Sequence, residues 1–344
     1  PFRLPKLHEL KRMANLYEWL NVSTMGFPEP FLFGFQAYHF LQQNGHRYDV
    51  IHDNQSLSYG LWALSRRWPT LATIHHPITV DRKIAVRAER YFWRKLKQLR
   101  WYSFIHMQKR VARTLSRILT VSQCAREDIR NDFGIPRERF RIVPNGINTA
   151  IFHPRPDVPR ENNRIIVTNS ADTPLKGLAY LLEAVAALRS RRPVQLVVIG
   201  QPKPNGPIER LVRKLDLADH VTFTGRISDA AFVRQYARAS MAVVPSVYEG
   251  FGLPAGEAMA CGVPVITTTG GALPEVVGDA GILVPPRDSA ALVAAIEDLL
   301  DHPDKAAAMG QQGYQRVQAH FTWQRAAEKT IAVYREVIDD HRRP

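Results

Sequence analysis

The sequence predicts an α/β protein with two domains, each built on a parallel sheet. Short apolar runs typical of buried strands alternate with helical segments along most of the chain, which is the βαβ pattern. Residues 149–163 contain three prolines and have the composition of an interdomain linker. The 344 residues are enough for two domains of ordinary size.

The first half of the chain begins with helices. Large apolar residues at helical spacing predict helices over roughly 6–20 and 30–44, separated by a Gly-Pro-rich loop. The elements that follow alternate strand and helix; in chain order they are strand 48–52, helix 56–67, strand 70–75, one long or two joined helices over 81–116, strand 117–122 and strand 140–143. Ser122 is a candidate helix N-cap.

The second half repeats the pattern more regularly. Its predicted strands are apolar runs with helices between them, at 164–169, 194–199, 221–224, 241–245, 263–268 and 282–284. An amphipathic helix is predicted from about Phe321 to Ile338. Gly-x-Gly-x-x-Gly does not occur, which argues against a dinucleotide-binding dehydrogenase.

Bulk composition favours a soluble globular protein of a reducing compartment. The chain is 45% hydrophobic and 23% charged. Its two cysteines, Cys124 and Cys261, lie far apart in unrelated contexts, so a disulfide framework is not expected. No apolar run approaches the ~20 residues that span a bilayer. We therefore expect a cytoplasmic protein.

Positive charge is concentrated in the first half. Residues 1–150 hold 24 Lys and Arg against 11 Asp and Glu, a net charge of +13, whereas residues 151–344 are near neutral at +1. Between Arg82 and Arg113 lie 11 bases, interleaved aromatic residues and the single acid Glu89. Such a segment suits an anionic membrane surface, and the alternative is the solvated basic face of a core-packed helix. Nucleic acid is not expected as a partner, because no recognition module accompanies the bases.

One motif joins a strand, a glycine loop and a helix start. Residues 249–262 read Glu-Gly-Phe-Gly-Leu-Pro-Ala-Gly-Glu-Ala-Met-Ala-Cys-Gly and follow the apolar run 241–245. The glycines let backbone approach a ligand closely, and free N–H groups at a helix start favour an anion. We expect Pro254 at the first helical position, Glu249 on the loop and Glu257 in the first helical turn. Carboxylates placed there accept hydrogen bonds from sugar hydroxyls.

This motif resembles the signature of retaining family 4 glycosyltransferases of the GT-B fold. The resemblance implies two Rossmann-like domains facing across a cleft, with a C-terminal helix that crosses back to the first domain. It also implies that Glu249 contacts the donor sugar and Glu257 the donor ribose. Backbone N–H groups of Gly250, Phe251, Gly252 and Leu253 would then hold sugar and phosphate.

The resemblance assigns further residues. His75, with His76 as the alternative, would contact the hydroxymethyl group of the donor sugar, although a lone histidine is more often structural. Lys176 would neutralise the diphosphate. The arginine that the family usually carries five or six residues earlier is replaced by Ala171 and Ser170. Gly200 borders the same edge, and Arg226 and Ile227 would border the nucleobase.

The expected domains are 1–147 for the acceptor side, a linker over 148–163, a nucleotide-sugar domain over 164–320 and a returning helix over 321–344. The resemblance covers residues 48–340 well and 1–47 weakly. The family begins with a strand, a Gly-Gly loop and a helix, and nothing before Tyr48 matches them. We therefore expect a chain that lacks this first unit.

The expected function is sugar transfer from a nucleoside diphosphate sugar to a sugar or lipid-linked acceptor, with retention of configuration. Asp-x-Asp does not occur, so we expect neither a metal nor another cofactor in donor binding. Attachment to the inner face of a membrane would place the enzyme at a lipid-linked acceptor. The alternatives are a nucleotide-sugar 2-epimerase of the same fold and a non-catalytic, membrane-associated binding module.

Overall fold

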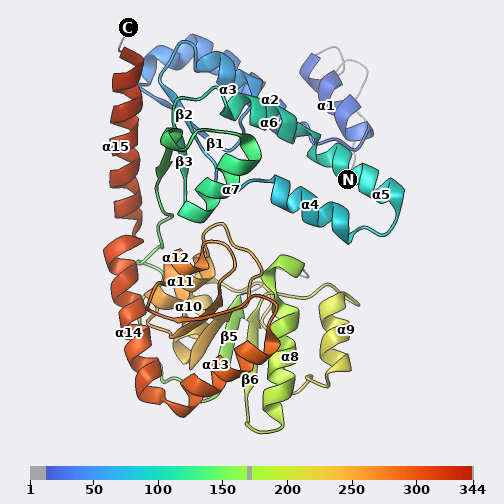
Figure 1. Ribbon diagram of the computed structural model, residues 1–344, viewed down its shortest axis with the longest axis vertical. Helices are drawn as coiled ribbons and strands as arrows, with labels where there is room; N and C mark the ends of the chain where they lie inside the picture. Colours follow the sequence, from blue (N-terminus) through green and yellow to red (C-terminus); the bar gives the residue numbers. More distant parts are fainter. Residues whose placement is uncertain (1–12, 169–172, 343–344) are drawn as a thin grey trace. The chain divides into compact units, whose positions relative to one another are not determined.

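The computed structural model describes residues 13–168 and 173–342. The chain forms two compact units, shown in Figure 1: residues Pro1–Val143 with Lys329–Pro344, and residues Pro144–Glu328. Residues 148–163, which we expected as a linker, are grouped with the second unit. Each unit is a parallel sheet with helices packed around it, so the predicted α/β class is confirmed.

The sheet of the first unit has four parallel strands in sequence order. They are β1 (Ile51–Asn54), β2 (Thr70–Thr73), β3 (Ile118–Thr120) and β4 (Phe140–Ile142). All four were predicted, and β1 begins three residues later than expected. The ladder sets this boundary, because Ile51 is the first residue of β1 that pairs with β2, opposite Thr70.

Helices α1 (Met13–Ser23), α2 (Glu29–Asn44), α3 (Tyr59–Leu64) and α7 (Gln123–Phe133) belong to this unit. Helices α2 and α3 approach closely at two glycines: a Cβ at Gly60 would lie 1.9 Å from the carbonyl oxygen of Gly34. Ser122 caps α7 as predicted, since its Oγ accepts a hydrogen bond from the backbone N–H of Ala125 at 3.0 Å.

The segment expected as one or two helices over 81–116 contains three. They are α4 (Thr79–Ala88), α5 (Phe92–Trp101) and α6 (Ile105–Ala112), with a 3₁₀ turn over Tyr102–Phe104. The chain is extended at Glu89 and Tyr91, which separates α4 from α5. Burial differs sharply along the segment: α6 buries five residues and α5 buries none. Helical spacing alone did not distinguish these two environments.

The last helix, α15 (Trp323–Arg342), supplies residues to the first unit. Val333 and Val337 pack in one buried cluster with Leu71 of β2 and Leu119 of β3. Arg117 and Arg141 both pair with the carboxylate of Glu336, and Arg117 also reaches Asp340 at 2.6 Å. The predicted return of the C-terminal helix to the first domain is therefore confirmed.

The sheet of the second unit has six parallel strands in the order β10-β9-β8-β5-β6-β7. In chain order they are β5 (Arg164–Thr168), β6 (Gln195–Ile199), β7 (Val221–Phe223), β8 (Met241–Val244), β9 (Val265–Thr268) and β10 (Ile282–Val284). Strands β8 and β9 are buried on both faces, as their continuous apolar runs predicted. Strand order reverses at β5, which has β6 on one side and β8 on the other.

Helices pack on both faces of this sheet. Helices α8 (Leu178–Arg189), α9 (Pro207–Lys214) and α13 (Ser289–Asp301) share one large core with alternate strand residues, and Figure 1 shows α8 beside α13. Right-handed crossovers in the opposite direction from β5 place the connecting helices on the other face. These helices are α10 (Asp229–Arg238), α11 (Leu253–Ala260) and α12 (Leu273–Val277). Helix α14 (Pro303–His320) packs on α11.

Candidate functional site

Three loops meet at the carboxyl edge of the second sheet, beside the point where strand order reverses. The loop after β8 receives a hydrogen bond from the β9 side, where Thr268 Oγ1 donates to the carbonyl of Ser246. Its own Val247 N–H donates to Leu175 O at 2.7 Å, in the loop after β5. Since α/β folds bind ligands at such a reversal, these loops form the first candidate site.

Two glycines allow this close contact between loops. A Cβ at Gly271 would lie 2.2 Å from the carbonyl oxygen of Glu249, and a Cβ at Gly177 would lie 1.9 Å from that of Pro245. Both glycines also have left-handed backbone, with φ of +71° and +68°. Side chains at these positions are excluded by contact as well as by conformation.

Lys176 and Glu249, predicted separately, are direct partners. Lys176 Nζ lies 2.6 Å from Glu249 Oε1, and Ser246 Oγ donates to the same oxygen at 2.9 Å. The Glu249 side chain is only 12% exposed and that of Lys176 29%. A cation and a fixed carboxylate are thus held side by side. Ser246 lies three residues before the start of the motif at Glu249, and its role in orienting Glu249 was not predicted.

The helix after the glycine loop begins one residue earlier than expected. Gly252, with φ of +104°, is the N-cap of α11, so Leu253 is the first helical residue and Pro254 the second. Glu257 therefore lies in the second turn, and its predicted position in the first turn is wrong. The left-handed glycine causes the shift, because it lets the chain turn directly into the helix.

The other residues of the glycine loop have different environments. Phe251 is buried and packs edge-on against Phe321, with ring centroids 5.7 Å apart. Its side chain is part of the core, so only its backbone is suited to ligand contact. Leu253 is 41% exposed. Gly250, between Glu249 and Phe251, is half-buried.

Glu257 is mostly buried, and burial raises its pKa to about 7. Burial, and then the nearby Glu257 carboxylate, raise the pKa of the Tyr236 hydroxyl well above its usual range. Tyr236 donates to the carbonyl of Pro254 at 3.3 Å and pairs with Thr168 Oγ1 at 3.1 Å. It therefore ties the start of α11 to β5. Sequence reasoning missed Tyr236, because nothing distinguishes it from other aromatic residues of an amphipathic helix.

Gly200, Arg226 and Ile227 follow β6 and β7 on the same sheet edge. The N–H of Gly225 donates to Gly200 O at 3.1 Å, which joins the two strand ends. Arg226 is exposed and Ile227 is half-buried. Since neighbouring strands lie ~4.8 Å apart, the edge from β8 to β7 spans roughly 15 Å. A ligand the length of a nucleotide fits along it. Ser170 and Ala171 stand where the family usually has an arginine, and both positions lie outside the described residues.

In the first unit, two histidines follow β2 and have different partners. His75 Nε2 lies 2.9 Å from Asn54 Oδ1, whereas His76 Nε2 pairs with Asp81 Oδ2 at 2.8 Å. Burial, and then the neighbouring His76, lower the pKa of His75. Lys176, Glu249 and Glu257 belong to the second unit. The expected position of His75 across a cleft from Glu249 stays a prediction.

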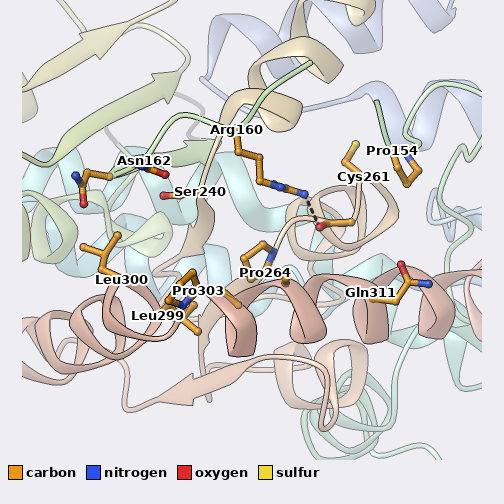
Figure 2. A pocket seen from close by; sticks show the side chains of 14 residues that line it. Pro154, Arg160, Asn162, Ser240, Cys261, Pro264, Leu299, Leu300, Pro303 and Gln311 are labelled. Atoms are coloured by element: carbon orange, nitrogen blue, oxygen red, sulfur yellow. Dashed lines mark hydrogen bonds between the residues drawn. The ribbon is translucent and has the colours of Figure 1, made fainter. Parts of the chain in front are cut away.

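A separate cavity of about 580 Å³ lies in the second unit (Figure 2). Its lining includes Arg160 and Asn162 just before β5, Ser240 just before β8 and Pro264 just before β9. These positions belong to the amino edge of the sheet. Arg160 donates to Gly262 O at 2.6 Å and so holds the chain beyond α11. No predicted site residue lines this cavity.

Across residues 13–168 and 173–342, no three His, Cys, Asp or Glu side chains are grouped to hold a metal ion. Metal-independent donor binding stays a prediction. Among the helices in the same ranges, none combines the length and apolar character that crossing a membrane requires.

Comparison with known proteins finds family models and relatives that match most of the chain. The family model described as Glycosyltransferase Family 4 matches residues 3–151, and the one described as Glycosyl transferases group 1 matches residues 152–316. An MMP alpha-(1->4)-mannosyltransferase from Mycolicibacterium hassiacum is 44% identical over 342 residues, covering 98% of this chain and 82% of the relative. A D-inositol 3-phosphate glycosyltransferase from Streptomyces avermitilis is 31% identical over 325 residues, covering 87% and 68%.

Among solved structures, a sucrose-phosphate synthase from Thermosynechococcus elongatus superposes with a TM-score of 0.73 at 30% identity. The similarity covers 90% of this chain and 78% of the synthase. Two units of this architecture and these relatives define a GT-B glycosyltransferase, an enzyme that moves a sugar from a donor to an acceptor. The chain belongs to glycosyltransferase family 4.

These findings confirm the predicted family, fold and class of activity. The two family models together reach from residue 3 to residue 316, so the match includes the first 47 residues, where we had found only weak resemblance. Neither a 2-epimerase nor a non-catalytic binding module is among the relatives described above.

Proposed function

We propose that the enzyme transfers a mannosyl residue from a nucleoside diphosphate sugar, forms an α-glycosidic bond and retains the configuration of the donor. The name of the 44% identical relative supports mannosyl transfer and the α linkage. The observation that carries the proposal is the Lys176–Glu249 pair at the reversal of strand order. It supplies a cation for the diphosphate and a carboxylate for sugar hydroxyls in one place.

The ion pair between Lys176 and Glu249 in the donor-free enzyme holds both side chains where the donor will bind. Lys176 Nζ moves from Glu249 to a phosphate oxygen when the donor binds, and Glu249 then accepts hydrogen bonds from the sugar hydroxyls. Ser246 keeps the carboxylate in place during this exchange. Because the bond from C1 to the phosphate oxygen breaks, negative charge grows on the diphosphate. Lys176 and the N-terminus of α11 stabilise that charge, which is catalysis by electrostatic preorganisation.

The remaining chemistry follows the front-face course of the family. The acceptor hydroxyl attacks C1 from the side that the diphosphate leaves, and its proton passes to the leaving phosphate oxygen. No side chain of the motif is needed as a nucleophile. Glu257 holds the ribose through charged hydrogen bonds, Arg226 and Ile227 border the nucleobase, and Gly200 lines the same edge of the sheet.

A donor panel tests the proposal. GDP-, UDP- and ADP-sugars, with mannose and glucose on each, are compared by thermal shift and by mass spectrometry of products made on α-mannoside acceptors. We expect turnover with a mannose donor and an α-anomeric proton in the NMR spectrum of the product. Lys176→Gln should lose ~10²–10³-fold in kcat, as loss of an oxyanion donor does, whereas Lys214→Gln serves as the surface control. A β-linked product, or transfer of glucose alone, would overturn the proposal.

We also propose that the first unit attaches the enzyme to an anionic membrane surface on the cytoplasmic side, where a lipid-linked acceptor is presented. The attachment site is the basic arm, residues 82–101, which holds eight Lys and Arg and the single acid Glu89. Fifteen of the nineteen exposed large hydrophobic side chains in the described residues lie between Tyr17 and Trp101. Apolar exposure and positive charge therefore coincide in this unit.

The tip of the basic arm combines these properties most strongly. Phe92 is 75% exposed and Trp93 61% exposed, and the guanidinium of Arg94 lies 5.0 Å from the Trp93 ring centroid. Aromatic rings settle at the membrane interface, and each base near an anionic surface adds ~1 kcal/mol. Helices α4 and α5 pack on each other, so the tip is carried on a helical support (Figure 1).

One base of the arm has a structural role instead. Arg100 donates to Asn21 Oδ1 at 3.0 Å and to Thr24 Oγ1 at 2.9 Å. It thereby joins α5 to the end of α1, and its replacement would disturb the fold of this unit. A test of membrane attachment must therefore leave Arg100 in place.

A further inference from the structure

Three neutral amide side chains hold the loop that carries His75. Asn54, the last residue of β1, accepts from the imidazole, with 2.9 Å between its Oδ1 and His75 Nε2. Gln55 Oε1 accepts from the backbone N–H of His75 at 2.9 Å, and Gln55 Nε2 donates to His76 O at 3.3 Å. Gln108 of α6, which is buried, donates to Gln55 O at 2.9 Å.

This arrangement determines which ring nitrogen of His75 carries the proton. An amide oxygen only accepts hydrogen bonds, so His75 Nε2 must be the protonated nitrogen. The neutral ring then has its lone pair on Nδ1, which has no hydrogen-bond partner within the described part of the chain. A nitrogen of this kind accepts a hydrogen bond from a hydroxyl group.

The electrostatic surroundings keep the ring neutral. Burial, and then His76 on the same loop, oppose a positive charge on His75 and lower its pKa, and His75 in turn lowers the pKa of His52 on β1. The nearby carboxylate of Asp81 pairs with His76. His52 is itself held at both nitrogens, by Tyr334 OH at 2.7 Å and by Thr73 Oγ1 at 2.7 Å. His52 therefore has no ring nitrogen left for a substrate, whereas His75 keeps Nδ1.

We propose that Asn54 is a positioning residue, which fixes the tautomer of His75 so that Nδ1 accepts a hydrogen bond from a hydroxyl of the donor sugar. This inference rests on the proposed function and on the contact with the donor sugar that the family resemblance implies for His75. The role of Asn54 is indirect: it touches His75 and not the substrate. The neutrality of the amide matters, because a carboxylate in its place would favour the doubly protonated ring, whose Nδ1 donates instead of accepting.

Two substitutions separate tautomer control from simple packing. Asn54→Leu removes the acceptor, so both tautomers should be populated and kcat should fall about 2- to 10-fold at every pH, the range of one neutral hydrogen bond. Asn54→Asp retains an acceptor for Nε2–H but raises the pKa of His75. Its activity should approach that of the wild type at high pH and be lost at lower pH, because the acid limb of the pH profile of kcat moves to higher pH. Asn44→Asp, on the exposed end of α2, is the matched control.

The tautomer itself is read without turnover. ¹⁵N chemical shifts of the His75 ring, assigned by comparison with His75→Gln, distinguish a protonated Nε2 from a protonated Nδ1, and the same spectra show that each variant is folded. A wild-type ring protonated at Nδ1 would overturn the proposal. So would an Asn54→Leu ring with unchanged tautomer, or a changed tautomer with unchanged kinetics. Failure of the proposed function is a different result, namely no mannosyl transfer by the wild type in the donor panel.

Discussion

Lys176 Nζ lies 2.6 Å from Glu249 Oε1, although 73 residues separate the two positions in the chain. Lys176 follows β5 and Glu249 follows β8, and these strands are neighbours only because the sheet reverses its order there. The pair therefore marks the site from two distant parts of the sequence. In the free enzyme, each side chain of the pair is held in place by the other before the donor binds.

Substitution of the pair should show energetic coupling. Lys176→Met and Glu249→Gln each remove one charge, and the double variant removes both. Because the pair is only partly exposed, we expect a coupling of about 1 kcal/mol in a double-mutant cycle of thermal unfolding. Additive effects of the two substitutions would mean that the ion pair contributes nothing to the free protein.

Substitution of Glu257 and of Glu249 should affect different steps, nucleotide binding in the first case and turnover in the second. Glu257→Ala should weaken binding of the nucleoside diphosphate by ~1.5–3 kcal/mol, about 10- to 150-fold, because a charged hydrogen bond to ribose is lost. Glu249→Ala should leave that affinity nearly unchanged and lower kcat with the sugar donor. Isothermal titration and steady-state kinetics measure the two effects, with Glu297→Ala as control. Equal losses of nucleotide affinity in both variants would refute the assignment.

Stability should depend on pH through Glu257. In the folded protein its pKa is about 7, against an ordinary value of 4.5. Between these values the folded state binds more protons than the unfolded state, so stability falls as pH rises from about 4.5 to about 7 and is level above. The full loss is about 3 kcal/mol.

Glu257→Gln lacks this titration, so its advantage in Tm over the wild type should grow between pH 5 and pH 8. Glu297→Gln, which removes a glutamate of the same unit outside the site, is the control. A Tm difference that stays constant with pH would show that the Glu257 carboxyl titrates alike in both states.

Two glycines with similar backbone provide a matched test of the loop contact. Gly271 and Gly225 have φ of +71° and +66°, but a Cβ would meet Glu249 O at 2.2 Å in the first case and nothing nearer than 3.8 Å in the second. Gly225→Ala should cost about 1 kcal/mol of stability from backbone strain. Gly271→Ala should cost at least 1–3 kcal/mol more and lower kcat, because it displaces Glu249. Similar Tm values for the two variants would contradict the close packing of these loops.

Membrane attachment should depend on the exposed bases and aromatics of the basic arm. The triple variant Arg90→Gln, Arg94→Gln, Lys97→Gln should release the enzyme from anionic vesicles, as should Phe92→Ser with Trp93→Ser. Binding of the wild type should weaken as salt rises, since charges are screened beyond ~8 Å at physiological ionic strength. Co-sedimentation with phosphatidylserine-containing vesicles at two salt concentrations measures both effects.

The control for charge is Arg213→Gln with Lys214→Gln and Arg335→Gln, three exposed bases outside the arm. It should sediment like the wild type, and all variants should keep their affinity for nucleotide. A wild type that stays in the supernatant at low salt would mean that the basic arm is an ordinary solvated face.

The sequence by itself determined the α/β class, the strands of both sheets and the family. Continuous apolar runs such as Met241–Val244 predict buried parallel strands because both faces of such a strand are covered. The motif around Glu249 is local, so its loop, glycines and helix were recognisable without a structure. The start of α11 was misplaced by one residue, since the left-handed Gly252 acts through backbone conformation and not through a residue pattern.

Only the tertiary structure decided which side chains meet. The partnership of Lys176 with Glu249 depends on strand order, and the tautomer of His75 depends on Asn54 from the neighbouring strand. The pKa of Glu257 depends on its burial in the folded chain. The contrast between exposed α5 and buried α6 was equally invisible, because both helices are amphipathic and basic. Contacts between distant segments follow from topology and packing, and the periodic pattern of apolar residues along the chain predicts neither.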